Sequence, residues 1–464
     1  MSFIYIPNPG IASSGSSGND TIYGSNNDDT LSGGVGNDVL YGYPATGAGA
    51  TDGNDLINGG DGFDTVYAST GDDTIEGGAA SDYLSYIWGS QVIHHIDLSM
   101  KLDLSTQTET RLVRKFDING NLIGTDQVSG IDIFRGTASS DTFFSADPAY
   151  SPQLAYHTFS IVGMGGSDTF TQVASAFSPS QTAPNNRSMG MILSYMWVQA
   201  DANGHGIELN YVGNSGTVKY FNSTNGQVAG MDTFTNISRF YDSQFNDVLD
   251  FSLAVENNFG FATRPKQNFL SHQILGISGG SDTVLGNGTT ILQLQLSNST
   301  TLLSGSGATV DLSKSSANLS NLSGFGTLTF SGIAGIVGTK FEDHLTGGGP
   351  SDSFYEIFNG QEGNDTIDGA GGFTRAASTN EGISWKIPGA LGHISFLSQD
   401  GTFAVLPSGE IGAQGTLASA GTIVITEKFD NRWKLLLNGT YVEPKETENG
   451  VPRFIAPEPG EFVI

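Results

Sequence analysis

A nine-residue repeat constrains this chain more than any other feature of its sequence. Residues 15–41 read GSSGNDTIY, GSNNDDTLS and GGVGNDVLY, and residues 50–85 read ATDGNDLIN, GGDGFDTVY, ASTGDDTIE and GGAASDYLS. The aspartates at the sixth position are Asp20, Asp29, Asp38, Asp55, Asp64, Asp73 and Asp82, and the aliphatic residues two positions later are Ile22, Leu31, Leu40, Ile57, Val66, Ile75 and Leu84. Such short units cannot bury their apolar residues alone, so we expect them to stack into a solenoid.

Glycine at the fourth position of the units predicts a tight turn before each short strand. These glycines are Gly18, Gly36, Gly53, Gly62 and Gly71. Glycine permits the positive φ angles of such turns, while the single aliphatic residue of each strand points inward. Stacked turns would bring carboxylates and backbone carbonyls into rows, which suit Ca²⁺ with its six to eight oxygen ligands better than Mg²⁺. The alternative is a metal-free solenoid in which the aspartates only form Asx-turns.

The pattern resembles the RTX, or hemolysin-type calcium-binding, repeat G-G-x-G-x-D-x-U-x. The resemblance is strong over residues 15–85 and patchy beyond them. It implies a parallel β-roll in which six residues form a turn and three form a strand, with the aspartates and turn glycines lining the metal sites. It also implies multiple Ca²⁺ ions, about five in this block, whose binding would order the roll because binding free energy becomes folding free energy.

Further units of the same kind occur downstream. A second block carries GTKFEDHLT, GGGPSDSFY and GQEGNDTID, in which the candidate metal-site residues are Asp343, Asp352, Gly363 and Asp365, and the following unit has Thr374 in place of aspartate. Isolated units carry Asp141, Asp168, Asp247 and Asp282. The sequence leaves open whether the isolated units bind calcium.

A longer duplication lies between the two blocks. Residues 119–143 align without a gap with residues 225–249 at an offset of 106, so that Asp126 matches Asp232. Apolar and polar residues alternate in both copies, and an Asn-Gly pair between such runs indicates a hairpin. Asp126 and Asp232 fit hairpin caps as well as metal ligands, and we favour the interpretation as caps.

These patterns predict an all-β fold, a parallel β-roll or β-solenoid interrupted by β-sandwich-like or sheet modules. The predicted parts are an N-terminal cap (1–14), the RTX block (15–85), three β modules (86–168, 169–282 and 283–337), a second RTX block (338–377) and a C-terminal β region with a secretion tail (378–464).

Composition narrows the class of protein. Lys and Arg number 19 against 47 Asp and Glu, a net charge of −28 that excludes nucleic acid as a partner and favours cations. Zero cysteines exclude disulfides and thiolate chemistry, and no apolar run is long enough to span a membrane. The start is not a Sec signal peptide, whereas the end, Glu461 to Ile464, resembles the tail of proteins exported by bacterial type I secretion machinery. We therefore expect an extracellular location at the bacterial cell surface.

The search for catalytic residues favours a protein that is not an enzyme. The chain has no H-E-x-x-H motif, and His94 and His95 should point to opposite faces of a strand. Ser278 fits G-x-S-x-G only inside a degenerate repeat, without a strand-to-helix context.

We therefore predict an extracellular calcium-binding structural protein that self-assembles: a surface-layer subunit, a matrix protein or an adhesin. One alternative is a polysaccharide lyase or epimerase on a β-helix. Another is a glycan-binding module in which Trp433 and Tyr441, among basic residues, contact a cell-surface polysaccharide.

Overall fold

The structure is a computed structural model that describes residues 2–5, 12–46, 52–86, 92–103, 108–145, 158–172, 190–255, 274–294, 306–348, 355–361 and 365–368, with separate strands between 373 and 463. The regular structure of these residues is all β-strand, which confirms the predicted fold class. In this part of the chain no helix is long and apolar enough to cross a membrane. The chain forms two compact units: unit 1 is Met1–Tyr241 with Asn257–Thr263, and unit 2 is Asp242–Glu256 with Arg264–Ile464.

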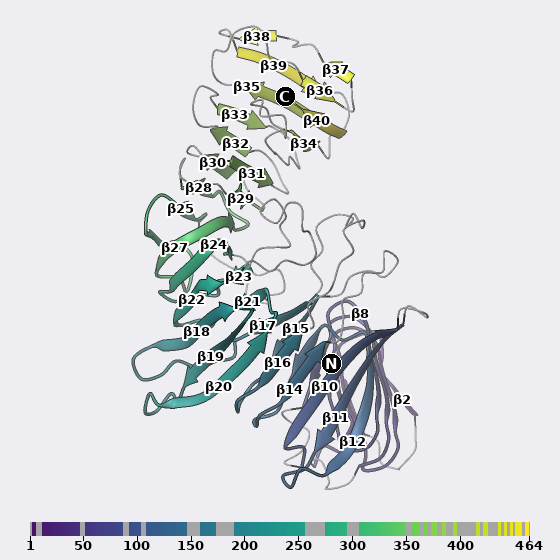
Figure 1. Cartoon of the computed structure of the whole chain (residues 1–464). Helices are drawn as coiled ribbons and strands as arrows, with labels where there is room; N and C mark the ends of the chain where they lie inside the picture. The colour runs from purple at the N-terminus through teal and green to yellow at the C-terminus, as the bar shows by residue number, and fades with distance from the viewer. Residues whose placement is uncertain are drawn as a thin grey trace. The chain divides into compact units, whose positions relative to one another are not determined.

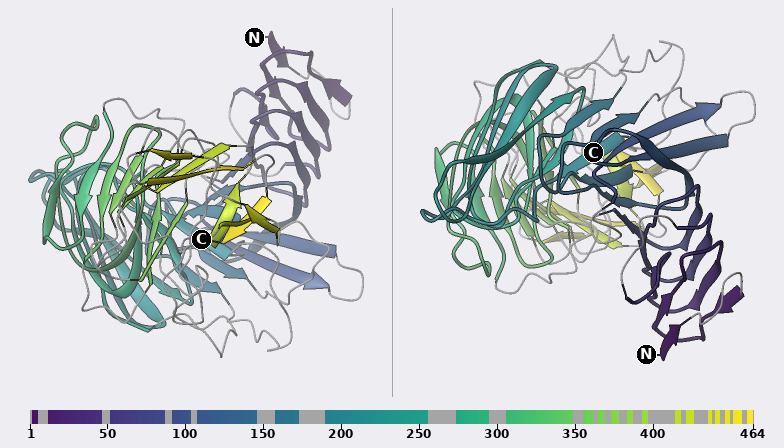
Figure 2. Two further views of the ribbon diagram at one scale, coloured as in Figure 1. Left: turned by 90° about the horizontal axis from the view of Figure 1, so that it is seen from above. Right: turned by 90° about the horizontal axis from the view of Figure 1, so that it is seen from below.

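Unit 1 begins with the predicted β-roll, in which each nine-residue unit contributes one short strand to one of two parallel sheets (Figures 1 and 2). The first sheet contains β2 (Ala12–Ser14), β4 (Thr30–Val35), β6 (Leu56–Asp61) and β8 (Thr74–Ala79). The second contains β1 (Ser2–Tyr5), β3 (Asp20–Tyr23), β5 (Val39–Tyr41), β7 (Thr65–Tyr67) and β9 (Tyr83–Ser85). Thr21 pairs with Val39, so one coil takes two repeat units.

The interior of the roll consists of the predicted aliphatic residues. All seven, from Ile22 to Leu84, are at most 1% exposed. The insertion around Pro44 leaves the ladder intact, since Thr30 still pairs in register with Leu56 and Val39 with Thr65. The register is therefore set by the buried residue of each strand rather than by the length of the connection.

The solenoid continues through the rest of unit 1. β9 is followed by a parallel series of β13 (Ile133–Arg135), β15 (Thr158–Val162), β17 (Gly190–Ser194) and β21 (Arg239–Tyr241). A second parallel series runs through β10 (His95–Asp103), β14 (Thr142–Ser145), β16 (Thr169–Gln172) and β20 (Val228–Thr235).

Long antiparallel strands extend this solenoid at two places. β10 pairs with β11 (Thr108–Phe116), which pairs with β12 (Leu122–Ser129), and β18 (His205–Gly213) pairs with β19 (Ser215–Phe221), which pairs with β20. β12 and β20 start 106 residues apart, which confirms the long duplication. The described parts of these modules are sheet extensions of the solenoid, the second of the two predicted forms.

Unit 2 has two parallel series of its own. One comprises β22 (Asn246–Ala254), β23 (Ile274–Gly276), β24 (Thr283–Gln293), β27 (Thr327–Val337), β29 (Tyr355–Asn359) and β31 (Phe373–Ala377), with β26 (Ser316–Asn318) antiparallel to β27. The other comprises β25 (Thr309–Asp311), β28 (His344–Thr346), β30 (Asp365–Asp368) and β32 (Ile383–Lys386).

The end of the chain is antiparallel. β32 leads to β33 (His393–Phe396), β35 (Gly421–Ile425), β39 (Val451–Ala456) and β38 (Glu446–Glu448). A separate sheet holds β34 (Gln414–Leu417), β40 (Gly460–Val463), β36 (Leu435–Leu437) and β37 (Thr440–Val442). The division into seven parts stays a prediction.

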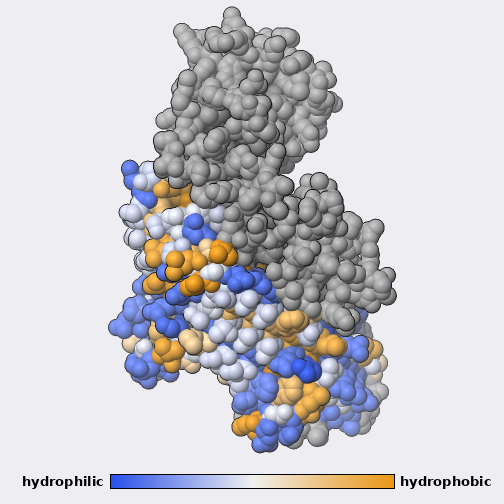
Figure 3. Space-filling view, viewed as in Figure 1, coloured by the Kyte–Doolittle hydropathy of each residue, from blue (hydrophilic) through white to orange (hydrophobic). Residues whose placement is uncertain are grey.

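Large apolar side chains are also exposed on the long strands. They include Leu112, Leu122, Val228 and Met231, and Figure 3 shows hydrophobic residues interspersed with hydrophilic ones over these strands. Scattered exposed apolar residues are ordinary on folded proteins, so they do not by themselves mark a site.

Candidate calcium-binding site

The seven sixth-position aspartates of the roll all point inward from the turns. Each is at most 3% exposed, an unusual burial for carboxylates. The carboxylate reaches back across its own turn, where Asp20 Oδ2 accepts the N–H of Ser16 at 2.6 Å and Asp29 Oδ2 accepts the N–H of Ser25 at 2.6 Å. Asp20 and Asp29 therefore close their own turns with a hydrogen bond.

The aspartates also connect one coil to the next. In what we call the first ladder, the N–H groups of Asp20, Asp38 and Asp64 each donate to the carboxylate of the aspartate one coil later, at 2.7–2.8 Å, and Asp82 donates in turn to Asp132. In the second ladder, Asp29, Asp55 and Asp73 donate in the same way, at 2.9–3.1 Å, and the last acceptor is Asp126. Two rows of carboxylates therefore run through the roll.

Several oxygens in these rows have no hydrogen-bond partner although they are buried. In the roll they are Asp29 Oδ1, Asp38 Oδ2, Asp52 Oδ2, Asp64 Oδ2 and Asp82 Oδ2. Buried polar atoms are nearly always satisfied, so each of these oxygens calls for a bound ion or water.

Burial also makes several carboxylates of the roll unfavourable to ionise. Burial, reinforced by neighbouring carboxylates, raises the pKa of Asp64 to about 6, of Asp82 to about 7 and of Asp55 to about 9. Burial likewise raises the pKa of Asp52 to about 7. Asp55, Asp82 and Asp52 therefore need positive charge nearby to be fully ionised at neutral pH.

Glycines shape the space around the carboxylates. A Cβ on Gly33, Gly59 or Gly77, at the first position of their units, would lie 2.5–2.8 Å from Oδ2 of the aspartate five residues later. Among the predicted fourth-position glycines, Gly36, Gly62 and Gly71 have positive φ, and a Cβ on Gly53 would lie 2.1 Å from the N of Asp28. Gly18 has open space, because it lies in the first coil.

The donor set of the roll fits a hard divalent cation. The buried groups are carboxylate and hydroxyl oxygens, several oxygens are unpartnered, and the turns leave no room for a side chain beside them. Oxygen-only donors are those that Ca²⁺ takes. The aspartates of both ladders would hold such ions, whose chemical role is to neutralise the rows.

The second ladder ends on a cation that the chain itself supplies. The Lys115 ammonium is fully buried and donates to Asp73 Oδ2 at 2.9 Å, to Ser69 O at 2.8 Å and to Asp126 Oδ1. The hydroxyl of Tyr86 donates to the other oxygen of Asp126 at 2.8 Å. Here an ammonium group neutralises the pair of carboxylates.

This geometry overturns the interpretation of Asp126 and Asp232 as hairpin caps. Asp126 is the last carboxylate of the second ladder, and the turn before β12 is instead capped by Asp117, whose Oδ1 accepts the N–H groups of Asn119 and Asn121. Asp232 ends a third ladder, described next. Both are fully buried, because the strands that carry them stack on the coil below.

The third ladder shows that isolated repeat units keep the same geometry. Asp141 donates its N–H to Asp168 at 2.8 Å, and Asp168 donates to Asp232 at 2.9 Å. Tyr220 pairs with Gly230 as Lys115 pairs with Gly124, so a phenol stands where the second ladder has its ammonium. Burial and the charge of Asp232 raise the pKa of Asp168 to about 9, and Asp168 Oδ2 has no hydrogen-bond partner.

The second predicted block is only partly described. Asp343 is buried and accepts the N–H groups of Thr339 and Ala308, each at 2.6 Å, as a ladder aspartate does. Asp365 lies in β30, without a described side chain, and Asp352 and Gly363 lie outside the described residues.

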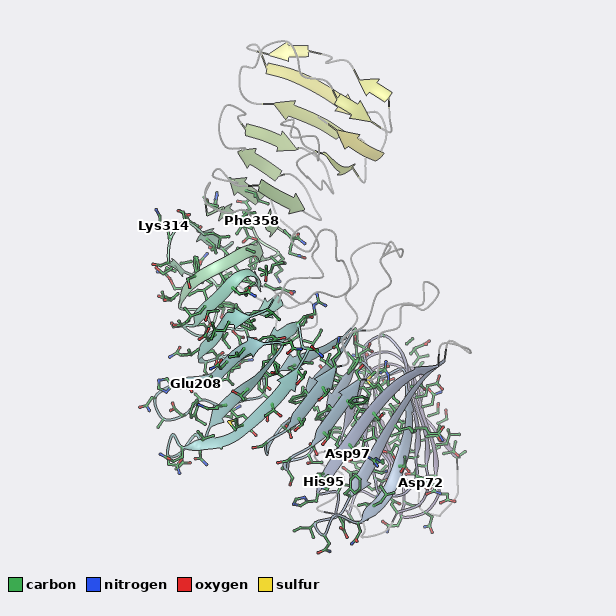
Figure 4. All side chains as sticks on the ribbon, in the orientation of Figure 1. Asp72, His95, Asp97, Glu208, Lys314 and Phe358 are labelled. Atoms are coloured by element: carbon green, nitrogen blue, oxygen red, sulfur yellow. The ribbon has the colours of Figure 1, made fainter. Side chains whose placement is uncertain are left out.

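The catalytic candidates do not assemble into a site. The rings of His94 and His95 are almost perpendicular, with centroids 6.2 Å apart, and His95 stacks on Phe116 (Figure 4). Ser278 uses its N–H to bind Asp242 Oδ1 at 2.7 Å and follows strand β23 without a described helix after it. Trp433 lies outside the described residues, and the side chain of Tyr441 is not described.

Three further aspartates near these sites were not predicted from the sequence. Asp132 accepts the N–H of Asp82 at 3.1 Å, while the half-buried Asp52 and the buried Asp242 each have a buried, unpartnered Oδ2. Asp52 and Asp242 occupy the third and first positions of repeat units, where the repeat pattern places no aspartate.

The paired parallel sheets and their aspartate-lined turns define a parallel β-roll with turns suited to calcium. The family model described as the RTX calcium-binding nonapeptide repeat, with four copies, matches residues 14–43, 49–84 and 356–373. These segments are therefore RTX-type calcium-binding repeats, and such repeats indicate a calcium-binding, secreted protein. No curated protein matches the chain.

Proposed function

We propose that this chain is an extracellular structural protein that binds several Ca²⁺ ions along its ladders and assembles at a bacterial cell surface when they bind. The observation that carries the proposal is the pair of continuous rows of buried aspartates with unpartnered oxygens. Several ions follow from several coils, because each coil repeats the same donors. Type I secretion machinery and a surface polysaccharide are the proposed partners.

Calcium supplies the free energy that the roll needs. Each ion that binds only the folded chain stabilises it by RT ln(1 + [L]/Kd), about 2.7 kcal/mol when calcium is a hundredfold above Kd. Calcium is scarce in cytosol and abundant outside cells, so the chain would fold after export.

A structural role is favoured over catalysis by the continuity of the solenoid. Parallel coils extend through unit 1, and His94 and His95 contact Ser139 and Phe116, respectively. Among the described residues, β1 and β2 each pair with a single strand, and we propose their other edges as the place where a second copy pairs. Surface-layer subunit, matrix protein and adhesin all fit this proposal.

Tyr23, Tyr41 and Tyr67 do not favour the glycan-binding alternative. Their rings stack face to face, with centroids 4.4 and 4.7 Å apart. Sugars bind the faces of aromatic rings, and in this stack the faces cover one another.

Calcium titration of metal-stripped protein tests the proposal, with circular dichroism and light scattering as readouts and Mg²⁺ as control. We expect β-signal and large regular particles to rise together with calcium only. A chain that is folded and monomeric without calcium would contradict the proposal. That result would favour the polysaccharide-active enzyme or the glycan-binding module instead.

A pair of matched variants tests whether the ladder aspartates bind the calcium. Asp38→Asn removes a buried carboxylate with an unpartnered oxygen, while Glu76→Gln removes the same charge from the exposed side of β8 and keeps an acceptor for Asn58. The calcium midpoint should rise about tenfold or more in D38N because ligand charge sets affinity. Equal midpoints in the two variants would contradict the assignment.

A further inference from the structure

Three buried aspartates in unit 2 meet at one point. Asp242, Asp247 and Asp282, the three-aspartate cluster, are 0–2% exposed. Each offers a carboxylate oxygen, and these oxygens lie within 4.8 Å of one another. The cluster is outside the segments that the family model matches, so its function must be argued from its own geometry.

Two of the aspartates are brought together by strand pairing. β22 and β24 are parallel neighbours, with Val248 opposite Thr283, which places Asp247 beside Asp282. The N–H of Asp247 donates to Asp282 Oδ1 at 2.9 Å, the same connection that joins coils in the roll.

The third aspartate replaces a glycine. Asp242 occupies the first position of the unit DSQFNDVLD. In unit 2, a Cβ on the first-position Gly338 would point at Asp343 Oδ2, only 2.2 Å away. A side chain at this position is thus directed at the sixth-position carboxylate, and aspartate there brings another carboxylate to the turn.

Protein donors fix these carboxylates but leave one oxygen unused. Asp242 Oδ1 accepts the N–H of Ser278 at 2.7 Å, and Asp247 accepts both the N–H and the hydroxyl of Ser243. Asp242 Oδ2 is buried and has no hydrogen-bond partner. An orphaned buried oxygen beside two further carboxylates is a sign of a missing ligand, independent of the number of acids.

The charges of the cluster require neutralisation. At the end of the second ladder, two carboxylates receive an ammonium from Lys115, whereas here burial and the charges of Asp282 and Asp247 raise the pKa of Asp242 well above its usual range. Either a proton or a cation can relieve this repulsion.

We infer that the three-aspartate cluster binds one Ca²⁺ ion in unit 2. Hard oxygen donors exclude thiophilic metals, and a site with several protein carboxylates suits Ca²⁺ better than Mg²⁺, which keeps most of its water. The ion would join the turn before β22 to the turn before β24. This site is separate from the ladders of the roll, so it stands or falls independently of the proposed function.

Counting bound calcium tests the inference in the full-length chain. Asp242→Asn keeps the shape and the bond from Ser278, and Asp250→Asn is the control, since Asp250 lies on β22 with Asp247, is partly exposed and binds only Ser252 in the described contacts. At calcium concentrations that saturate the wild type, equilibrium dialysis with elemental analysis should show one ion fewer per chain in D242N and no loss in D250N. An unchanged count in a folded D242N would mean that the cluster holds a proton, and would overturn the inference.

A measurement on the wild type covers the case in which D242N does not fold. Crystals of the full-length chain grown with Tb³⁺ as a calcium substitute should give an anomalous peak between the three carboxylates. Absence of that peak, with peaks present in the roll, would reject this site and leave the proposed function intact. A peak at the cluster with none in the roll would support this site and reject calcium binding by the ladders.

Discussion

At the scale of single residues, some turn glycines of the repeat are required by the backbone conformation and others are not. Gly62 has φ of 134°, and its Cβ would lie 1.9 Å from the carbonyl oxygen of Gly36 in the preceding coil. Gly18 occupies the same position of its unit but has nothing within 4 Å. A glycine at the fourth position of the repeat is therefore required in one coil and replaceable in another.

We expect Gly62→Ala to destabilise the calcium-bound protein by on the order of 3 kcal/mol, because alanine is strained at this φ angle and its Cβ would clash with the preceding coil. Gly18→Ala should stay within about 0.5 kcal/mol of wild type. Urea unfolding in saturating calcium measures both values. A Gly18 variant as unstable as the Gly62 variant would show that the repeat position, and not the contact, sets the cost.

Lys115 gives a second prediction at this scale. Lys115→Met leaves Asp73 and Asp126 buried without their ammonium, and we expect a loss of about 3–5 kcal/mol. Arg114→Met removes the neighbouring cation, whose side chain is 56% exposed and pairs with Asp97, and should cost less than about 1 kcal/mol. Thermal unfolding of the two variants at equal calcium compares them, and equal losses would argue against a buried ion pair.

The sequence predicts a residue well when its environment lies within its own repeat. The seven aspartates and seven aliphatic residues of the roll could be assigned because period and turn chemistry are local. Lys115 could not, since its partner Asp73 is 42 residues away on another strand. A signal for Asp126 did exist, because its match to Asp232 in the long duplication suggested a shared role.

At the scale of elements, the ladders predict an unusual pH dependence. Asp64, Asp82 and Asp55 have pKa values raised to about 6, 7 and 9 in the folded chain, against about 3.9 when unfolded. Because the folded pKa is the higher one, protons stabilise the folded metal-free chain. This contribution is complete below about pH 4 and is lost as the pH rises through roughly 6 to 9.

The metal-free chain, which we expect to be unfolded at pH 8, should therefore gain β-structure and some resistance to urea at pH 5, and Asp55→Asn should weaken this gain. With saturating calcium the trend should reverse, because the ion binds deprotonated carboxylates and competes with protons. Urea titrations at several pH values, with chelator and with calcium, check both signs. Metal-free stability that increases between pH 5 and 8 would contradict the assignment of these carboxylates.

The elements also explain why the long modules were harder to predict than the roll. Alternating residues indicated strands, but both a sandwich and a sheet extension satisfy that pattern. The choice depends on β12 pairing with β8 and β20 pairing with β16, contacts between strands far apart in the sequence. Nothing in a local window carries this information.

At the scale of the whole molecule, every described connection between ladder aspartates runs in one direction. The N–H belongs to the earlier coil and the carboxylate to the later one, in the roll, in the third ladder and between Asp247 and Asp282. A ladder therefore has a direction, since in each pair the earlier coil supplies the N–H and the later coil supplies the carboxylate. Blocks of coils cut from this protein could be concatenated head to tail, whereas a head-to-head splice would set carboxylate against carboxylate at the junction.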